Sequence, residues 1–238
     1  MRYRWFLLGY LTPLLAFLVV FVALAYVIRP KPPPRLVHIR PASSYSVRGI
    51  DISHHQGEID WKRVASSGRV QFAWIKASQG KTYTDPRFAE NWEAAQAAGI
   101  KVGAYHYYSM CKGGAEQAEH FIATVPKVDG ALPPAVDVEE DARCNRRVPW
   151  NIKSELDAYL DRVEVHYGVR PMLYVTSWYM AEHLGEPDAD LWLAAYTRHP
   201  RREFSFWQFT SRGQVPGIVG PVDLDIYAGK RSELQALR

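Results

Sequence analysis

The 238-residue chain is poor in cysteine, has no internal repeat, and carries no excess of basic residues outside its first 40 positions. Two cysteines cannot build a disulfide scaffold or a four-thiolate zinc site. The formal charge of +4 comes from residues 1–40, which hold six cations and no acid, whereas the remaining 23 Lys and Arg face 25 Asp and Glu. Because binding to a phosphate backbone needs a basic surface, we expect no nucleic-acid partner.

Metal-binding motifs are also missing. The sequence contains no HExxH and no paired CxxC, and His54, His55, His106 and His120 do not have the spacing of a zinc site. His106 lies inside an apolar segment, where a hydrogen-bonded core histidine is expected. We therefore predict neither a metal nor an organic cofactor.

The longest uncharged run lies near the N-terminus, at residues 6–28. As a helix it would span about 34 Å, enough to cross a hydrocarbon core of roughly 30 Å, so we predict a single transmembrane helix. Ala23-Leu24-Ala25 resembles a signal-peptidase site, and cleavage after Ala25 would instead give a secreted protein. The proline-rich segment that follows predicts an extended spacer. The predicted organisation is an anchor or signal segment (1–29), a linker (30–46), a barrel (47–230) and a C-terminal tail (231–238).

From residue 47 onward, short apolar runs alternate with amphipathic stretches, which is typical of a parallel α/β fold. Eight strands are predicted, at residues 48–53, 72–78, 101–108, 135–138, 172–176, 191–195, 204–209 and 222–226. The clearest helix has Asp85 as its N-cap and Pro86 as its first residue, and another covers 151–167. Because the gaps between the last three strands are short, we expect a barrel that is regular in its first half and irregular at its end.

Acidic residues mark three of these strands. Asp137 and Glu139 alternate along one strand and share a face, with about 7 Å between their α-carbons. Asp51 lies in the first strand and Asp223 in the last, and these strands are neighbours in a closed barrel. Acids at strand ends are commonly solvated loop residues, but three such ends at one mouth favour an active site.

Aromatic residues gather at the same strand ends. Rings with polar edges next to carboxylates suit a sugar, although alternation along a strand also buries many such rings in the core. We predict substrate contacts for Tyr107, Tyr174, Trp178, Tyr196, Trp207 and Gln208.

The two cysteines, Cys111 and Cys144, follow the third and fourth predicted strands and should lie in neighbouring loops. We predict a disulfide between them. A thiol nucleophile is the rival interpretation, although no partner base stands next to either cysteine.

Seven stretches, in order, carry a resemblance to a known family: GIDISHHQGEIDW, FAWIKASQGKTYTDPRF, GIKVGAYHYY, PAVDVEE, LYVTSWY, LWLAAY and FWQFTSRGQVPGIVGPVDLDIYAG. The chain from Val47 to Gly229 thereby resembles the glycoside hydrolase family 25 lysozymes, also called the Chalaropsis type. The resemblance implies an irregular TIM-like barrel of five β/α units plus three strands. It also implies an N-acetylmuramidase that cleaves the β-1,4 bond between N-acetylmuramic acid and N-acetylglucosamine in peptidoglycan.

By motif, the family's acids fall on Asp51, Asp137, Glu139 and Asp223. Glu139 matches the residue that protonates the leaving oxygen, and Asp137 is expected to be its charged neighbour. Retaining, inverting and substrate-assisted routes stay open; we favour attack by the substrate's acetamido carbonyl, with Asp137 stabilising the resulting cation. The alternatives are a non-catalytic peptidoglycan-binding module and an amidase or deacetylase acting on the same polymer.

The chain departs from the family pattern at two positions. Gln79 stands where the family often has Glu, which places any acid role there in doubt. Asp225 stands where Asn is usual, and its spacing from Asp223 predicts two carboxylates on one face, one of which titrates high.

Peptidoglycan lies outside the cytoplasmic membrane, so the domain that cleaves it must lie there too. We therefore expect a monomeric enzyme anchored in the bacterial inner membrane, with its catalytic domain on the periplasmic or exterior side.

Overall fold

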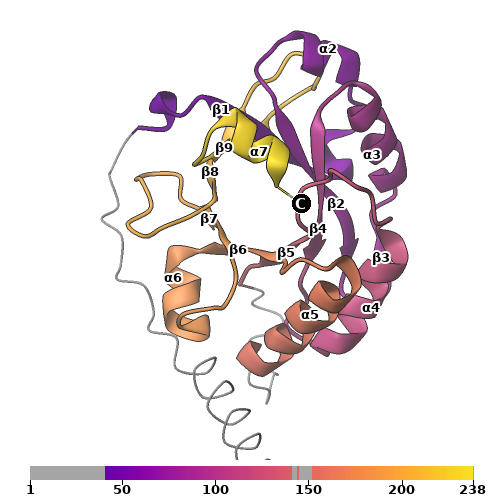
Figure 1. Cartoon of the computed structure of the whole chain (residues 1–238), viewed down its shortest axis with the longest axis vertical. Helices are drawn as coiled ribbons and strands as arrows, with labels where there is room; N and C mark the ends of the chain where they lie inside the picture. Colours follow the sequence, from indigo (N-terminus) through magenta and orange to yellow (C-terminus); the bar gives the residue numbers. More distant parts are fainter. Residues whose placement is uncertain (1–40, 141–143, 145–151, 238) are drawn as a thin grey trace, which may run out of the picture. The chain divides into compact units, whose positions relative to one another are not determined.

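A closed barrel of eight strands forms the centre of the computed structural model, which describes residues 41–140, 144 and 152–237 (Figure 1). The strands are β1 (Val47–Ile52), β2 (Phe72–Gln79), β4 (Lys101–Tyr107), β5 (Ala135–Val138), β6 (Met172–Thr176), β7 (Leu191–Ala194), β8 (Phe206–Gly213) and β9 (Val222–Tyr227). The barrel closes because β1 pairs with both β2 and β9. All eight predicted strands are present, and a short strand that was not predicted, β3 (Tyr83–Thr84), pairs with the end of β2.

The first seven barrel strands, β1, β2 and β4 to β8, run parallel around the barrel, and β9 runs antiparallel to both of its neighbours. The sequence pattern predicted a parallel last strand, so the antiparallel direction of β9 corrects that prediction. A short connection from β8 allows a hairpin but not a parallel crossover. As a result the beginning of β9, and not its end, lies at the mouth where β1 ends.

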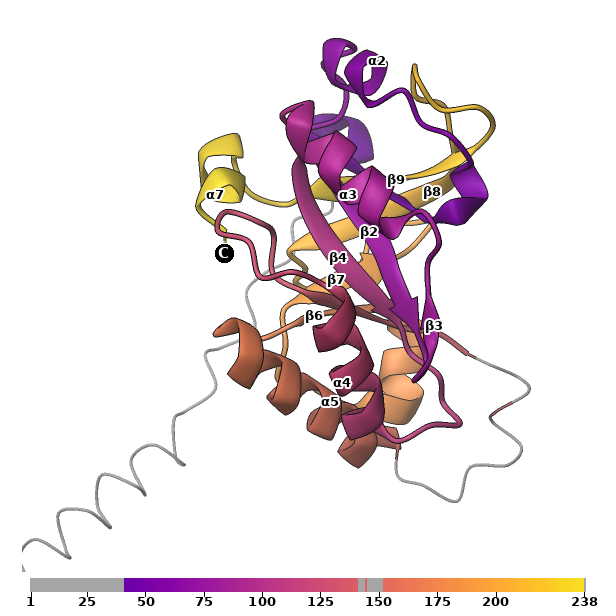
Figure 2. The ribbon, with the colours of Figure 1, turned by 90° about the vertical axis from the view of Figure 1, so that its right-hand side faces the viewer.

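Helices follow each of the first five barrel strands. They are α2 (Trp61–Ser66), α3 (Phe88–Ala97), α4 (Gly114–Thr124), α5 (Ile152–Tyr167) and the single turn α6 (Ser177–Tyr179), which continues into the π-helical turn η3 (Met180–Leu184). Figure 2 shows α3 and α4 alongside β2 and β4. Between β7 and β9 every residue is described and none is helical, so the order is five β/α units followed by three strands, as expected.

Helix α3 begins later than predicted. Its first residue is Phe88, and Arg87 occupies the N-cap position. Asp85 instead forms a turn before the helix, because its Oδ1 accepts a hydrogen bond from the Arg87 N–H (3.0 Å) while Oδ2 accepts from the His54 N–H (3.0 Å). Asp85 therefore ties the start of α3 to the loop after β1.

Alternation along the strands divides the core into two layers. One set of side chains packs between the barrel and the helices, and includes Ile50, Ile75 and Val136. The other fills the barrel and is mostly aromatic: Phe72, Trp74, Tyr105, Tyr174, Trp192 and Phe206. Gly103 leaves room for these rings, since a β-carbon there would meet the Trp74 indole.

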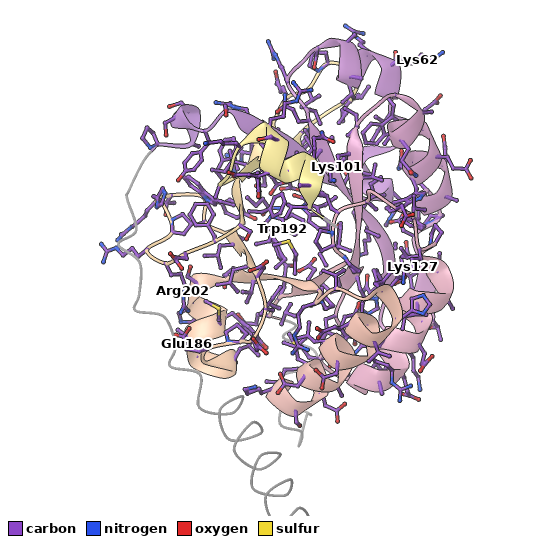
Figure 3. The ribbon with its side chains drawn as sticks, in the orientation of Figure 1. Lys62, Lys101, Lys127, Glu186, Trp192 and Arg202 are labelled. Atoms are coloured by element: carbon purple, nitrogen blue, oxygen red, sulfur yellow. A yellow bond between two sulfur atoms is a disulfide. The ribbon has the colours of Figure 1, made fainter. Side chains whose placement is uncertain are left out.

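Residues 231–236 form helix α7 (Arg231–Ala236), where we had expected a tail. Leu234 is fully buried against the barrel interior with Val47 and Phe72, the first residues of β1 and β2. The Lys101 ammonium donates to the carbonyls of Gln235 (3.1 Å) and Leu237 (3.0 Å), and Figure 3 shows Lys101 beside this helix. Helix α7 therefore closes the end of the barrel opposite the acidic mouth.

The predicted transmembrane helix, residues 6–28, lies outside the described residues. Within the part of the chain that is described, no helix is both long and apolar enough to cross a membrane. Of the predicted linker, residues 41–46 are described and contain a short turn of 3-10 helix, η1 (Ala42–Ser44).

Candidate active site

A pocket of about 270 Å³ opens at the end of the barrel where β1, β2, β4 and β5 finish. Eight of the ten residues predicted for catalysis or substrate contact line it: Asp51, Asp137, Glu139, Asp223, Tyr107, Tyr174, Tyr196 and Gln208. The lining is completed by Ile52, Ser53, His55, Gln56, Lys76, Tyr105 and Trp192. The four acids carried over from the family pattern therefore meet in one pocket.

Two strand pairings bring the acids together. Asp51 on β1 lies opposite Asp223 on β9 as its direct register partner. Asp137 on β5 pairs with Tyr107 on β4 and Tyr174 on β6. Because side chains alternate along β5, Glu139 emerges on the same face as Asp137, one residue beyond the strand's end.

Asp137 and Glu139 form an acidic pair with raised pKa values. Burial raises the pKa of Asp137, and the Glu139 charge raises it further. Burial also raises the pKa of Glu139, and this effect exceeds the opposing effects of the Tyr174 hydroxyl and the Lys76 ammonium. Burial thus disfavours the anionic form of both carboxyls, and the expectation of a charged Asp137 beside a protonated Glu139 stays a prediction. Two neighbouring carboxyls with raised pKa values are suited to share one proton.

Lys76 is a site residue that was not predicted from the sequence. Its side chain is 8% exposed, its Nζ donates to Gln79 Oε1 (2.9 Å), and it lies 4.6 Å from the centre of the Tyr107 ring. Burial lowers the pKa of Lys76, while the charges of Asp137, Asp85 and Glu139 raise it. The signal in the sequence was a lysine that follows the apolar run Phe72–Ile75 at the inward-facing position after Phe72 and Trp74. The amide oxygen of Gln79 thus accepts a hydrogen bond from the Lys76 ammonium, at a position where the family often has a carboxylate.

Gln208 on β8 connects three of the site's polar groups. Its Nε2 donates to Asp51 Oδ2 (2.7 Å), and its Oε1 accepts from the hydroxyls of Tyr174 (2.9 Å) and Tyr196 (2.6 Å). The Tyr174 hydroxyl also lies 3.4 Å from Glu139 Oε1. A buried network thus links the acid on β1 to the acid beyond β5.

Asp223 and Asp225 both face into the barrel from β9, as their spacing predicted. Burial and the Glu139 charge raise the pKa of Asp223 to about 6. Asp225 is fully buried, and burial raises its pKa to about 7 although the Trp192 N–H bond opposes the shift. Both carboxyls therefore hold a proton to a higher pH than an ordinary aspartate does.

Two predicted substrate contacts do not line the pocket. Alternation along β8 turns Trp207 to the outside of the barrel, where it packs with Tyr45 and Ile226 and its Nε1 donates to the Ala195 carbonyl (2.8 Å). Trp207, predicted to contact the substrate, therefore lies outside this pocket. Trp178 lies on α6, beyond the end of β6, and its side chain is 58% exposed.

Cys111 and Cys144 are joined by a disulfide that closes a sequence separation of 33 residues. Neither sulfur is therefore available as a thiol nucleophile. His106 is fully buried, contacts Ser78 Oγ (2.8 Å) and Gln117 Oε1 (3.3 Å) and stacks on Tyr159, as expected of a core histidine. In the described part of the chain, no group of three His, Cys, Asp or Glu side chains is arranged to hold a metal ion.

Paired carboxyls with raised pKa values, tyrosine hydroxyls and aromatic walls in a barrel mouth define a site for acid-base cleavage of a carbohydrate. The comparisons agree with this class. Residues 50–218 match the model of the glycosyl hydrolases family 25. The chain belongs to this family and is a glycosidase.

Several relatives are similar over most of the chain. YegX of Escherichia coli (strain K12) is 36% identical over 214 residues, which cover 86% of this chain and 78% of YegX. Lysozyme M1 of Streptomyces globisporus is 30% identical, covering 84% of this chain and 74% of that protein. The solved structure of a family 25 glycosyl hydrolase from Bacillus anthracis superposes with a TM-score of 0.76 at 32% identity, covering 85% of this chain and 98% of the other.

Proposed function

We propose that this chain is a lysozyme that hydrolyses the β-1,4 bond between N-acetylmuramic acid and N-acetylglucosamine in peptidoglycan. The observation that carries the proposal is the Asp137–Glu139 pair, with raised pKa values, in a pocket walled by tyrosine hydroxyls. A relative that is 30% identical bears the name Lysozyme M1, which supports the same activity.

Glu139 acts as the general acid in this mechanism. Its proton passes to the glycosidic oxygen as the bond from that oxygen to C1 of the muramic acid breaks. Glu139 is the more accessible member of the pair, since Asp137 is 8% exposed, and it lies at the end of β5 where a glycan strand can reach it. The Glu139 carboxylate then takes a proton from the water that attacks C1, which restores the acid.

Asp137 assists the substrate's own acetamido group. The acetamido carbonyl oxygen attacks C1 as the leaving group departs, and the ionised Asp137 stabilises the positive charge that develops at the amide nitrogen. The nearby Lys76 ammonium favours this ionised form. Asp51 and Asp223 orient groups around the reacting centre, and the pocket-lining Tyr107, Tyr174, Tyr196 and Gln208 contact the sugar.

Digestion of purified sacculi tests the activity. A lysozyme releases fragments with new reducing-end muramic acid, which borohydride reduction and mass analysis of the products detect. Release of free peptide would indicate an amidase, and release of acetate a deacetylase. Binding to sacculi without any soluble product would indicate a non-catalytic wall-binding module.

We further propose that residues 6–28 anchor a monomeric enzyme in the inner membrane, with the barrel on the periplasmic or exterior side. The apolar length of this segment supports an anchor, and a disulfide is typical of oxidising compartments. Sequencing the N-terminus of the mature protein tests the anchor, because a chain that begins at Tyr26 would be secreted.

A further inference from the structure

A second groove, of about 330 Å³, adjoins the catalytic pocket beside β7 and β8. Tyr196 lines both spaces, so the groove and the pocket meet at this side chain. The Tyr196 hydroxyl donates to Gln208 in the catalytic pocket (2.6 Å), while 54% of the residue is exposed. Since the catalytic pocket measures about 270 Å³, the groove offers room of a similar size to a polymer that continues past Tyr196.

The groove combines aromatic and polar side chains. Trp207 and Phe209 contribute rings from β8, with centroids 6.0 Å apart, and Thr197 and Arg198 are exposed residues of the loop after β7 (residues 195–205). Rings next to hydroxyl and guanidinium groups suit a sugar, because its C–H faces pack on the rings while its hydroxyls form hydrogen bonds. None of the described residues that line the groove is acidic, so it has the features of a binding site and not of a reacting centre.

The remaining wall comes from Pro41 and Ala42, which precede the residues that match the family model (50–218). The short turn η1 holds this wall in place. The N–H and the hydroxyl of Ser44 both donate to the Pro41 carbonyl (2.9 and 2.8 Å), and the Tyr45 N–H donates to the Ala42 carbonyl (3.2 Å). Part of the segment predicted as a linker therefore belongs to the groove.

Tyr45 joins this turn to the loop after β7. Its hydroxyl lies 3.0 Å from His199 Nε2, and its ring meets the Trp207 ring edge-on. His199 Nδ1 lies 2.6 Å from the Pro200 carbonyl; since a carbonyl only accepts, Nδ1 carries the hydrogen, and Tyr45 donates to Nε2 in the neutral form of the ring. The Trp207 N–H donates to the Ala195 carbonyl (2.8 Å). These contacts join all three walls, so the groove is formed before a ligand binds.

We propose that this groove binds the sugar of the glycan strand that lies next to the two sugars flanking the cleaved bond. The shared Tyr196 makes the groove continuous with the catalytic pocket, as a single linear polymer requires. The stem peptide of peptidoglycan is the other possible occupant, and the experiment below separates the two. The proposal rests on the proposed function, because it extends the substrate of that reaction.

Two peptide-free substrates test the groove. The disaccharide of N-acetylmuramic acid linked to N-acetylglucosamine spans only the cleaved bond. The tetrasaccharide that begins with N-acetylglucosamine has the same bond at its centre, with one further sugar on each side. If the groove binds the next sugar, the wild type should cleave the tetrasaccharide with a kcat/KM about tenfold or more above that of the disaccharide.

Two variants change the groove without touching the catalytic pocket. Phe209→Ala removes a ring from the lining, and Thr197→Trp fills the groove from its exposed rim. Each should lower kcat/KM on the tetrasaccharide by about three- to tenfold and change it on the disaccharide by less than about twofold. The control is Val165→Ala on α5, where valine is 86% exposed, and it should match the wild type on both substrates.

Thermal unfolding first establishes that the variants fold; if Phe209→Ala does not, Thr197→Trp alone decides, because it leaves the core unchanged. Equal losses on both substrates, or no loss on the tetrasaccharide, would overturn the proposal. A loss that appears only on glycan still bearing its peptides would assign the groove to the stem peptide and would overturn it too.

Binding measurements separate this proposal from the proposed function. Titration calorimetry of the tetrasaccharide is carried out in a Glu139→Gln background, where no turnover is needed. The groove variants should raise Kd by about three- to tenfold in this background. If they do so but the wild type releases no reducing ends, the lysozyme proposal fails alone. If the wild type cleaves glycan but Thr197→Trp leaves Kd unchanged, the groove proposal fails alone.

Discussion

Asp51 and Asp223 are direct partners across the antiparallel pair of β1 and β9, the seam where the barrel closes. The partnership exists because β9 reverses direction after β8, which turns the beginning of β9 toward the mouth. Asp51 and Asp223 thus join Asp137 and Glu139 in one pocket of about 270 Å³. Burial raises the pKa of each of these four carboxyls, and neighbouring carboxylates raise those of Asp51, Asp137 and Asp223 further.

Lys76→Met should move the acid limb of the pH profile upward. The ammonium lowers the pKa of both Asp137 and Glu139, so its removal raises both values. Because Asp137 must be ionised for turnover, activity should then be lost at a higher pH as the solution is acidified, with kcat/KM at pH 5 reduced by about tenfold. The measurement is kcat/KM from pH 4 to pH 8. Lys81→Met, which removes an exposed lysine that contacts Glu116, is the control and should match the wild type. An unshifted acid limb in the Lys76 variant would show that this cation does not act on the pair.

The stability of the folded chain should fall as pH rises from about 4 to about 7. Folding raises the pKa of Asp225 from its ordinary value of 3.8 to about 7, so between these values the folded state binds a proton that the unfolded state has released. The contribution is complete below pH 3.8 and is lost as pH passes 7. Urea unfolding at pH 5 and pH 8 measures the fall, which D225N should reduce. An equal fall in both proteins would contradict the raised pKa.

Loss of the disulfide between Cys111 and Cys144 should lower stability without removing a catalytic group. In the chain-entropy account, opening a loop of 33 residues costs about 3 to 4 kcal/mol of unfolding free energy. The paired variant Cys111→Ser with Cys144→Ser, compared with the wild type in urea, gives the value. A midpoint that does not change between the two proteins would be inconsistent with this contribution.

Gly103→Ala should destabilise the barrel. Its β-carbon would meet the Trp74 indole ring and approach the Leu132 β-carbon to 2.9 Å, and Trp74 is fully buried and stacked on Trp192. Overpacking of this kind costs about 1 to 3 kcal/mol. Gly130→Ala is the comparison variant. Gly130 lies at a surface turn with a positive φ and no neighbour within 4 Å, so alanine there introduces backbone strain without overpacking. If the G103A protein were as stable as the wild type, the side chains inside the barrel would be able to move aside at no cost in stability.

Most of the architecture was predictable from two local patterns: the apolar runs that form the strands, and the acidic residues at the strand ends. They located all eight barrel strands and placed Asp51, Asp137, Glu139 and Asp223 at one mouth, because these features depend on local pattern. The direction of β9 was not predictable from its own residues, since an antiparallel strand has the same alternation as a parallel one. Trp207 was assigned to the pocket by residue type, although its neighbour Gln208 takes the inward position.

Other features depend on contacts between distant segments. Asp85 looked like a helix cap, but its second oxygen binds the loop that contains His54, 31 residues earlier. Lys76 on β2 acquires its role by facing Asp137 on β5, and Gln208 on β8 acquires its role by donating to Asp51 on β1. The disulfide was predicted from loop positions alone, because both cysteines follow strands that are neighbours in the barrel.

The most direct test of the account compares Glu139→Gln on two substrates. One is natural glycan, whose leaving sugar needs a proton; the other is an aryl glycoside of N-acetylmuramic acid whose leaving phenolate needs none. If Glu139 is the general acid, kcat/KM on glycan should fall by about 10²- to 10⁴-fold, and on the aryl glycoside by less than about tenfold. Equal losses on both substrates would contradict the claim that Glu139 delivers the proton.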